Sequence, residues 1–213
     1  MQEVDRRTAR SGHVDQASLL AEALKLHHAY AAAMPYDGGE YGIALLARGE
    51  LRDLRTVRLP RGGTEEPRVA ILATCELPGG RTVRFGNTHL AADWQAKDPE
   101  KIRAAQAAEL VRVLKAEAGA SRNPLLIVGD FNCDSKSAAL SQFSAAGRKL
   151  NADLLSNPAI RPTAALDHGF YVPAPHPTIT FEVRGAKTEP STASDHLPLV
   201  IDIEFRDGPP AVA

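Results

Sequence analysis

The stretch Leu125-Leu126-Ile127-Val128-Gly129-Asp130-Phe131-Asn132 decides the fold of this 213-residue chain. Its four consecutive apolar residues predict a strand that is buried on both faces. The strand ends in a glycine and two short polar side chains, Asp130 and Asn132. Since residues two apart on a strand share a face, we expect a carboxylate and an amide side by side at its end. A turn held by local hydrogen bonds is the alternative interpretation of Asp-Phe-Asn.

The composition is that of an ordinary globular protein, with 44% hydrophobic and 24% charged residues. The length predicts one domain over residues 1–207, followed by a disordered tail at 208–213. A net charge of −1 argues against a protein whose affinity comes from wrapping nucleic acid. Cys75 and Cys133 have neither metal-site nor disulfide-framework spacing, so we expect two reduced core thiols.

The sequence has no segment that predicts membrane insertion or export. No apolar run approaches the length of a transmembrane span. Charged residues follow Met1 almost at once, which is unlike a signal peptide. We therefore expect a cytoplasmic protein, although a signal peptide upstream of Met1 would escape this test.

The hydrophobic pattern alternates strands with amphipathic helices. The clearest helix is 99–118, in which apolar residues recur at helical spacing and Gly119 lies just beyond the end. We expect further helices at 16–28 and 135–147. Strands are predicted at 41–47, 53–59, 68–76, 81–90, 165–172, 178–183 and 197–205, besides the one that begins at Leu125. Hairpin links between most of these strands predict two sheets packed face to face with helices outside.

Three more polar clusters lie at the ends of predicted strands. Asn87-Thr88-His89-Leu90 closes one strand, Asp167-His168 stands at the start of another, and Asp195-His196 comes directly before a third. His89 and His196 stand out because each has a hydrogen-bonding neighbour beside a strand end. Any one cluster is weak evidence, but together with Asp130 and Asn132 they are hard to explain as core or solvated surface.

Taken in order, these clusters resemble the motifs of the endonuclease/exonuclease/phosphatase superfamily, metal-dependent phosphoesterases related to pancreatic deoxyribonuclease and neutral sphingomyelinase. The resemblance extends from Gln2 to about Glu204. It implies an α+β fold, a four-layer sandwich of two mainly antiparallel mixed sheets flanked by helices. The segments that carry it are Gln2-Glu3-Val4-Asp5, Asn87-Thr88-His89-Leu90, Gly129-Asp130-Phe131-Asn132, Leu166-Asp167-His168 and Ser194-Asp195-His196-Leu197-Pro198.

The resemblance implies a divalent cation, Mg²⁺ or Mn²⁺, held by Glu3 with Asp195 nearby. Such ions prefer oxygen ligands and keep several waters, so few protein ligands are needed when a substrate phosphate completes the shell. By the same resemblance, Asp130 orients or deprotonates the attacking water. Asn132 donates hydrogen bonds to the phosphate or to that water.

The resemblance also implies a pair of histidines at the phosphate. Asp167 would hold His196, fix its tautomer and raise its pKa, which favours a protonated ring. His89 would be a second donor to the phosphate, with Asn87 supporting it from the same strand face. Two weaker supporting candidates are Tyr41 and Arg10.

One part of the family pattern has no counterpart, because the first strand and its metal-site Asn are missing before Gln2. Glu3 would then lie on a segment prone to fraying. Three explanations are open: a start codon assigned too late, a deliberately shortened chain, or a truncated homologue completed by a partner. The first two are preferred, because Met1 abuts the motif so abruptly. In the chain as written, unpaired strand edges predict a homodimer.

The sequence thus predicts a metal-dependent phosphoester hydrolase, either a phosphodiesterase or a phosphatase. The alternative is a weakened or inactive homologue that serves as a binding or scaffold protein. A zinc hydrolase fits less well, since His89 and His196 lack the close spacing of zinc ligands. The substrate stays open among small molecules, lipid headgroups and nucleic acid. A basic series is interpreted as solvated surface rather than a nucleic-acid groove; it comprises Arg48, Arg52, Arg55, Arg58 and Arg61.

Overall fold

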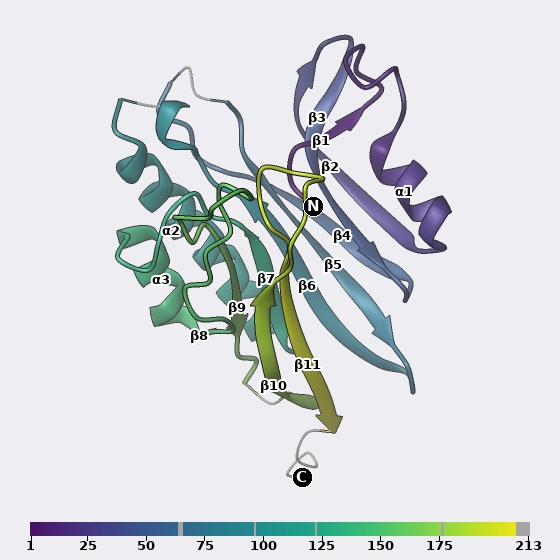
Figure 1. Ribbon diagram of the computed structural model, residues 1–213. Helices are drawn as coiled ribbons and strands as arrows, with labels where there is room; N and C mark the ends of the chain where they lie inside the picture. The colour runs from purple at the N-terminus through teal and green to yellow at the C-terminus, as the bar shows by residue number, and fades with distance from the viewer. Residues whose placement is uncertain (64–65, 96, 122, 176, 208–213) are drawn as a thin grey trace.

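The computed structural model describes residues 1–63, 66–95, 97–121, 123–175 and 177–207, arranged in four layers (Figure 1). The predicted tail at 208–213 lies outside the described residues. The elements are β1 (Val4–Arg6), α1 (Gln16–Leu24), β2 (His27–Tyr36), β3 (Gly39–Ala47), β4 (Leu51–Arg58), β5 (Val69–Leu77), β6 (Arg81–His89), η1 (Asp93–Gln95), α2 (Pro99–Ala120), β7 (Leu125–Asp130), α3 (Ala138–Ala146), β8 (Arg148–Lys149), β9 (Asp167–Val172), β10 (Ile179–Thr188) and β11 (Leu199–Asp207).

The larger sheet has the strand order β4-β5-β6-β7-β9-β8 within the described residues. Its neighbours are antiparallel except β6 and β7, which are parallel because the long helix α2 carries the chain back between them. The parallel register sets His89 opposite Asp130, and the antiparallel pairing of β7 with β9 sets Asp130 opposite Asp167. Three polar residues therefore share one level across three adjacent strands.

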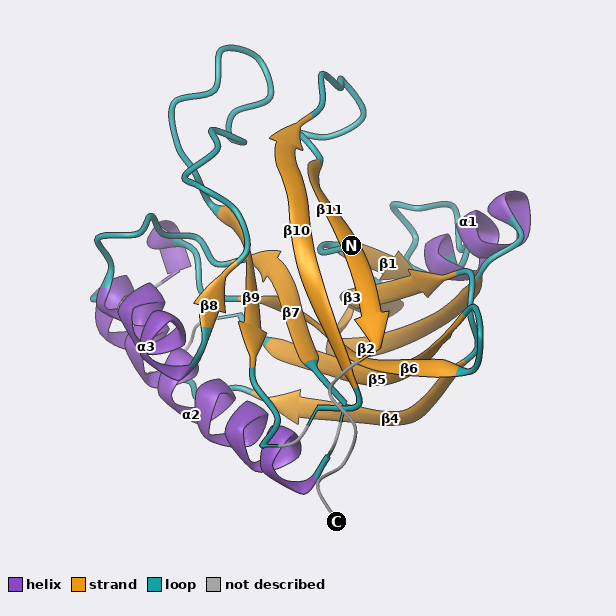
Figure 2. Cartoon of the chain, turned by 90° about the horizontal axis from the view of Figure 1, so that it is seen from below, coloured by secondary structure: helices purple, strands orange, loops and turns teal. Residues whose placement is uncertain are grey.

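The second sheet layer is in two parts, β1-β3-β2 and β10-β11. One apolar cluster joins β2 and β3 to β5, and another joins β10 and β11 to β6 and β7. Helices α2 and α3 cover the outer face of the larger sheet, whereas α1 lies against β1-β3-β2 (Figures 1 and 2). This is the α+β sandwich predicted from the sequence.

A groove of about 770 Å³ separates the two parts of the second layer. Its apolar floor includes Phe85 and Leu126, and its wall on β11 includes Ile201 and Ile203. Among the described residues β11 pairs only with β10, so its other edge faces the groove. The unpaired edge expected from the sequence is therefore present, and the homodimer expected from it stays a prediction.

An aromatic cluster fixes the back of β7. Phe131 follows Asp130 and packs edge-on against Phe143 of α3, with ring centroids 5.0 Å apart, while Phe170 of β9 stacks on Phe143 at 5.2 Å. All three side chains are fully buried. Both predicted thiols, Cys75 and Cys133, are buried and free. Close packing of these three rings thus anchors the end of β7.

We expect Phe143→Ala to lower the free energy of unfolding by about 3–5 kcal/mol, because it removes a buried ring and leaves a cavity between two others. Urea unfolding followed by circular dichroism measures this loss. Leu24→Ala is the matched control, since Leu24 is 61% exposed at the end of α1. Its effect should stay within about 0.5 kcal/mol; equal losses in the two variants would contradict the packing described.

Two predicted helices have different bounds in the structure. The helix predicted at 16–28 ends at Leu24, because Lys25 adopts a left-handed conformation and its N–H bonds back to Ala21 and Glu22. The helix predicted at 135–147 begins at Ala138, since the Ser137 side chain caps it. No helix in the described part of the chain is long and apolar enough to span a membrane.

Strand β2 was not predicted at all. Its inward face consists of Ala29, Ala31 and Ala33, which are buried against the larger sheet. Alanine is the strongest helix former and is depleted in strands, so the local sequence gives no strand signal here. Hydrogen bonding to β3 along the whole of β2 makes this segment a strand despite its low strand propensity.

Candidate active site

Gly129 allows β7 to place Asp130 beside β6. A Cβ atom at Gly129 would lie 2.1 Å from the carbonyl oxygen of Thr88, so only glycine permits this approach. Asp130 follows with its side chain almost entirely buried. Burial, and then the charge of Asp167, raise the pKa of the Asp130 carboxyl to about 7. The carboxyl can therefore gain or lose a proton near neutral pH.

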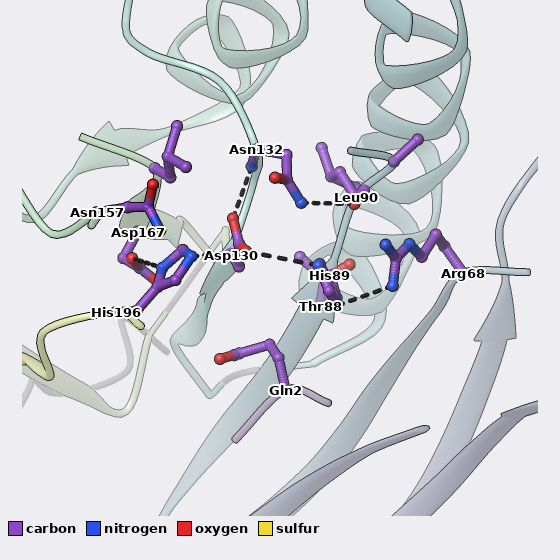
Figure 3. Close-up of polar contacts among 12 residues, drawn as sticks. Gln2, Arg68, Thr88, His89, Leu90, Asp130, Asn132, Asn157, Asp167 and His196 are labelled. Carbon is purple, nitrogen blue, oxygen red and sulfur yellow. Dashed lines mark hydrogen bonds and ion pairs between the residues drawn. The ribbon is translucent and has the colours of Figure 1, made fainter. Parts of the chain in front are cut away.

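Two imidazoles face the same carboxylate oxygen (Figure 3). His89 Nε2 lies 3.5 Å from Asp130 Oδ2, and His196 Nε2 lies 3.8 Å from it. His89 comes from the end of β6, whereas His196 comes from the loop before β11. The structure thus brings residues separated by more than a hundred positions to one carboxylate.

Asp167 holds His196. Its Oδ2 accepts a hydrogen bond from His196 Nδ1 at 2.8 Å, and this bond raises the pKa of His196 to about 9. The ring is therefore an imidazolium at neutral pH. Backbone bonds also fix the loop, since Leu197 N donates to Ser156 O. The pairing of His196 with Asp167 predicted from the sequence is present, and the catalytic role of the pair stays a prediction.

Asn132 lies beyond the end of β7, in a left-handed conformation with φ of 51°. It is therefore not on the strand face that the sequence predicted. It still meets Asp130, because its backbone N–H donates to Asp130 Oδ1 at 2.8 Å. One hydrogen of its side-chain amide goes to the Leu90 carbonyl at 3.1 Å. The amide is thereby held at the site, with the contact to phosphate still a prediction.

The sequence did not predict that Arg68 contacts His89. Arg68 lies directly before β5, is 3% exposed, and places Nη1 3.0 Å from His89 Nδ1. Burial and the Arg68 charge together hold the pKa of His89 well below its ordinary value. The available signal was an arginine opening the apolar run Val69–Leu77, which pairs with the strand that ends at His89.

Asn87 binds the N-terminal segment rather than His89. It is fully buried, and its amide donates to the carbonyl oxygens of Met1 and Ala44 at 2.8 and 3.0 Å. Its Oδ1 accepts a hydrogen bond from the Gln2 side chain at 2.6 Å. The Asn87 side chain therefore fixes the N-terminal segment that contains Glu3 against the larger sheet.

The two predicted metal ligands, Glu3 and Asp195, are placed differently in the structure. Glu3 lines the groove together with Ser194, His196 and Asp167, and its backbone φ is 55°. The Asp195 side chain is exposed, and its Oδ1 accepts a 3.3 Å hydrogen bond from Ser194 Oγ. Of the two predicted metal ligands, Glu3 thus lines the groove and Asp195 has an exposed side chain, and their role stays a prediction.

The two weaker candidates differ in their distance from this network. Tyr41 is buried and lines a small cavity with Arg68 and His89, and burial raises the pKa of its hydroxyl. Arg10 instead makes a two-pronged ion pair with Asp5, at 2.7 and 2.8 Å, and stacks on Tyr36. Tyr41 thus lies near the network, with its supporting role still a prediction, whereas Arg10 belongs to an ion pair with Asp5.

The donors at the site bear on which metal ion could be held there. Among the described residues, no group of three or more His, Cys, Asp or Glu side chains could hold a metal ion. Zinc sites need three or four such ligands. Magnesium is usually bound through one or two carboxylates, with waters and substrate phosphate completing its shell. Glu3 and Asp195 are the carboxylates that the sequence predicts for such an ion, and this assignment stays a prediction.

Comparison with known proteins places the chain among relatives of similar architecture. It is 31% identical over 206 residues to nocturnin of Xenopus laevis, covering 82% of this chain and 51% of the relative, so it spans about half of that protein. The human nocturnin catalytic domain, solved with a bound sulfate anion, is 24% identical with a TM-score of 0.70, covering 90% of this chain and 77% of that one.

A mannosyl-6-phosphatase from Bacteroides thetaiotaomicron has the same fold, with a TM-score of 0.71 at 19% identity over 89% of this chain and 81% of its own. The family model for the endonuclease/exonuclease/phosphatase family matches residues 1–196. That match runs from the N-terminal segment to His196 and takes in every side chain of the network above. The chain belongs to the endonuclease/exonuclease/phosphatase family.

Proposed function

We propose that this protein hydrolyses phosphoesters with the help of a divalent metal ion, at the site built around Asp130. The observation that carries the proposal is the buried Asp130 carboxyl, with a pKa of about 7, facing two imidazoles. Groups with such perturbed pKa values gather at catalytic sites. Family membership supports phosphoester chemistry in general, since the family comprises endonucleases, exonucleases and phosphatases.

In the proposed reaction, the Asp130 carboxylate orients a water and accepts its proton as the water oxygen attacks phosphorus. The bond from phosphorus to the leaving oxygen breaks on the opposite side. His196, as an imidazolium, donates a hydrogen bond to a phosphoryl oxygen, where negative charge grows in the transition state. His89 Nε2–H and the Asn132 amide are further donors.

A metal ion bound at Glu3 and Asp195 would neutralise the phosphoryl and leaving oxygens. Enzymes of this family generally use divalent metals. We propose Mg²⁺, with Mn²⁺ as the alternative, because the protein offers few ligands and all of them are oxygens. The remaining shell falls to water and substrate.

We expect kcat/KM to follow a bell-shaped pH profile with limbs near 7 and 9. The active form has Asp130 deprotonated and His196 protonated, so activity falls below the Asp130 pKa of about 7 and above the His196 pKa of about 9. Asp167→Asn should move the alkaline limb down toward about 6.5, the ordinary histidine value, and should also lower the acidic limb, because the charge of Asp167 raises the pKa of Asp130. A profile with the same alkaline limb in the variant would contradict the assignment of His196.

Calorimetric titration with MgCl₂ distinguishes the proposed hydrolase from a non-catalytic binding or scaffold protein. We expect saturable binding to the unaltered protein, weakened about tenfold or more by Glu3→Gln, because charge on the ligands sets the affinity for hard cations. Glu109→Gln is the control, since Glu109 pairs with Arg112 on the outer face of α2. No saturable binding to the unaltered protein would favour the scaffold.

The substrate is proposed only as a class. The basic series around β4 gives no support for a nucleic-acid groove, since Arg52 pairs with Glu50 and Arg55 pairs with Glu117. Small phosphomonoesters, phosphodiesters and lipid headgroups all satisfy the chemistry at Asp130. A panel of such compounds, assayed with MgCl₂ and with MnCl₂, identifies the class by relative kcat/KM.

A further inference from the structure

We propose that Arg68 is a positioning residue that fixes the tautomer of His89 and so aims the Nε2 proton at the reaction centre. The inference starts from one contact, between Arg68 Nη1 and His89 Nδ1 at 3.0 Å. A guanidinium has only donors and keeps its charge in proteins. His89 Nδ1 must therefore accept this hydrogen bond, which leaves the ring proton on Nε2, the atom 3.5 Å from Asp130 Oδ2.

The position of Arg68 is set by its surroundings. Glu66 Oε1 accepts a hydrogen bond from Nη1 at 2.6 Å, which compensates a buried charge that would otherwise be costly. The antiparallel register of β5 with β6, Ala70 opposite Thr88, carries the arginine to the end of the strand that bears His89. Arg68 and His89 are each only 3% exposed, so neither side chain can turn into water to find another partner.

The two histidines at Asp130 therefore have partners of opposite charge. Asp167 holds His196 through Nδ1 and favours the imidazolium. Arg68 holds His89 through Nδ1 and favours the neutral ring. In many active sites, neighbouring titratable groups have pKa values that their environments shift in opposite directions. Such groups then take different roles as acid, base or hydrogen-bond donor. His89 is thus a neutral hydrogen-bond donor, and only His196 brings a positive charge to the phosphate.

The neutral state of His89 also affects the pKa of Asp130. Two imidazoliums facing Asp130 would repel each other and would lower the pKa of the base between them. With His89 neutral, the pKa of Asp130 stays near 7, where a general base works best. The role of Arg68 in turnover rests on the proposed function, whereas its control of the His89 tautomer does not.

The tautomer is measured directly by long-range ¹H–¹⁵N spectra of protein labelled at histidine. We expect His89 at pH 7 to carry its proton on Nε2, with Nδ1 unprotonated. In Arg68→Met the Nδ1 signal should shift toward the protonated position. Arg84→Met is the matched control, because Arg84 is a buried arginine of β6 that binds Glu117 and the Asp53 carbonyl. A His89 protonated on Nδ1 in the unaltered protein, or unchanged signals in Arg68→Met, would overturn the proposal.

A double-mutant cycle tests whether Arg68 acts through His89. We expect Arg68→Met to lower kcat about 10- to 100-fold with little change in KM, as is usual when the partner that orients a catalytic group is lost. In a His89→Gln background it should have no further effect, since the Gln amide reaches the Nε2 position without an atom at Nδ1. Equal losses in both backgrounds would overturn the proposal.

Arg68→Lys guards against a variant that fails to fold. The ammonium keeps a positive charge and a donor at Nδ1, so we expect the tautomer to be retained and kcat to recover to within a few-fold. Loss of the tautomer in a folded Lys variant would count against the proposal. If the unaltered protein hydrolyses no phosphoester, the proposed function fails, and the spectra still decide the role of Arg68.

Discussion

Asp130→Asn should lower kcat by about 10²- to 10⁴-fold, the range lost when a positioned general base is removed. The substitution keeps the size of the side chain and its acceptor for the Asn132 N–H, so the end of β7 should keep its shape. It removes the group that takes the proton from water. Steady-state hydrolysis of the best phosphoester from the substrate panel, with saturating MgCl₂, measures the loss.

The control for this variant is Asp202→Asn, which changes an exposed carboxylate on β11 and should leave kcat within about twofold. The acidic limb of the pH profile is a second readout, because it belongs to the Asp130 carboxyl and should vanish with it. Full turnover in Asp130→Asn, in folded protein, would end the assignment of Asp130 as the base.

His196→Ala should lower kcat by about 10²- to 10³-fold, comparable to losing one preorganised donor at a developing negative charge. The expected size is large because the ring is held as an imidazolium by Asp167 at 2.8 Å. Its charge is therefore already in place before phosphorus is attacked. The loss is measured with the same substrate as for Asp130→Asn.

His28→Ala is the matched control, since His28 is exposed on β2, far along the chain from the polar network. It should leave kcat unchanged. In His196→Ala the alkaline limb of the pH profile should also disappear, which distinguishes loss of the imidazolium from a general loosening of the loop. Equal activity of the His28 and His196 variants would reject the proposed role.

The sequence predicted those site residues that can be recognised from their immediate neighbours in the chain. The apolar strand that leads into Gly129 and Asp130 is visible in eight residues, and it forms the centre of the larger sheet. His89 and His196 were found because each stands beside a polar neighbour at a strand end. Hydrophobic periodicity also predicted five of the strands of the larger sheet, with errors mainly at their ends, but not the short strand β8.

The missed features depend on partners far away in the chain. Strand β2 is alanine-rich, and it is a strand only because β3 pairs with it and the larger sheet covers it. Asn87 was expected beside His89, yet it binds the Met1 carbonyl, 86 residues away. No sequence motif pointed to Arg68 as a site residue. Its effect on His89 depends on the register of a hairpin, which propensity does not encode.

By itself, the sequence determined which functional groups this protein possesses and which strands carry them, because strand burial and strand ends are written in local polarity. The tertiary structure alone decided the protonation of His89. Whether an imidazole is neutral or charged depends on whether a guanidinium or a carboxylate meets its Nδ1, and both partners arrive from other strands. Burial then strengthens the contact of Arg68 with His89 at the end of β6, since water no longer screens it.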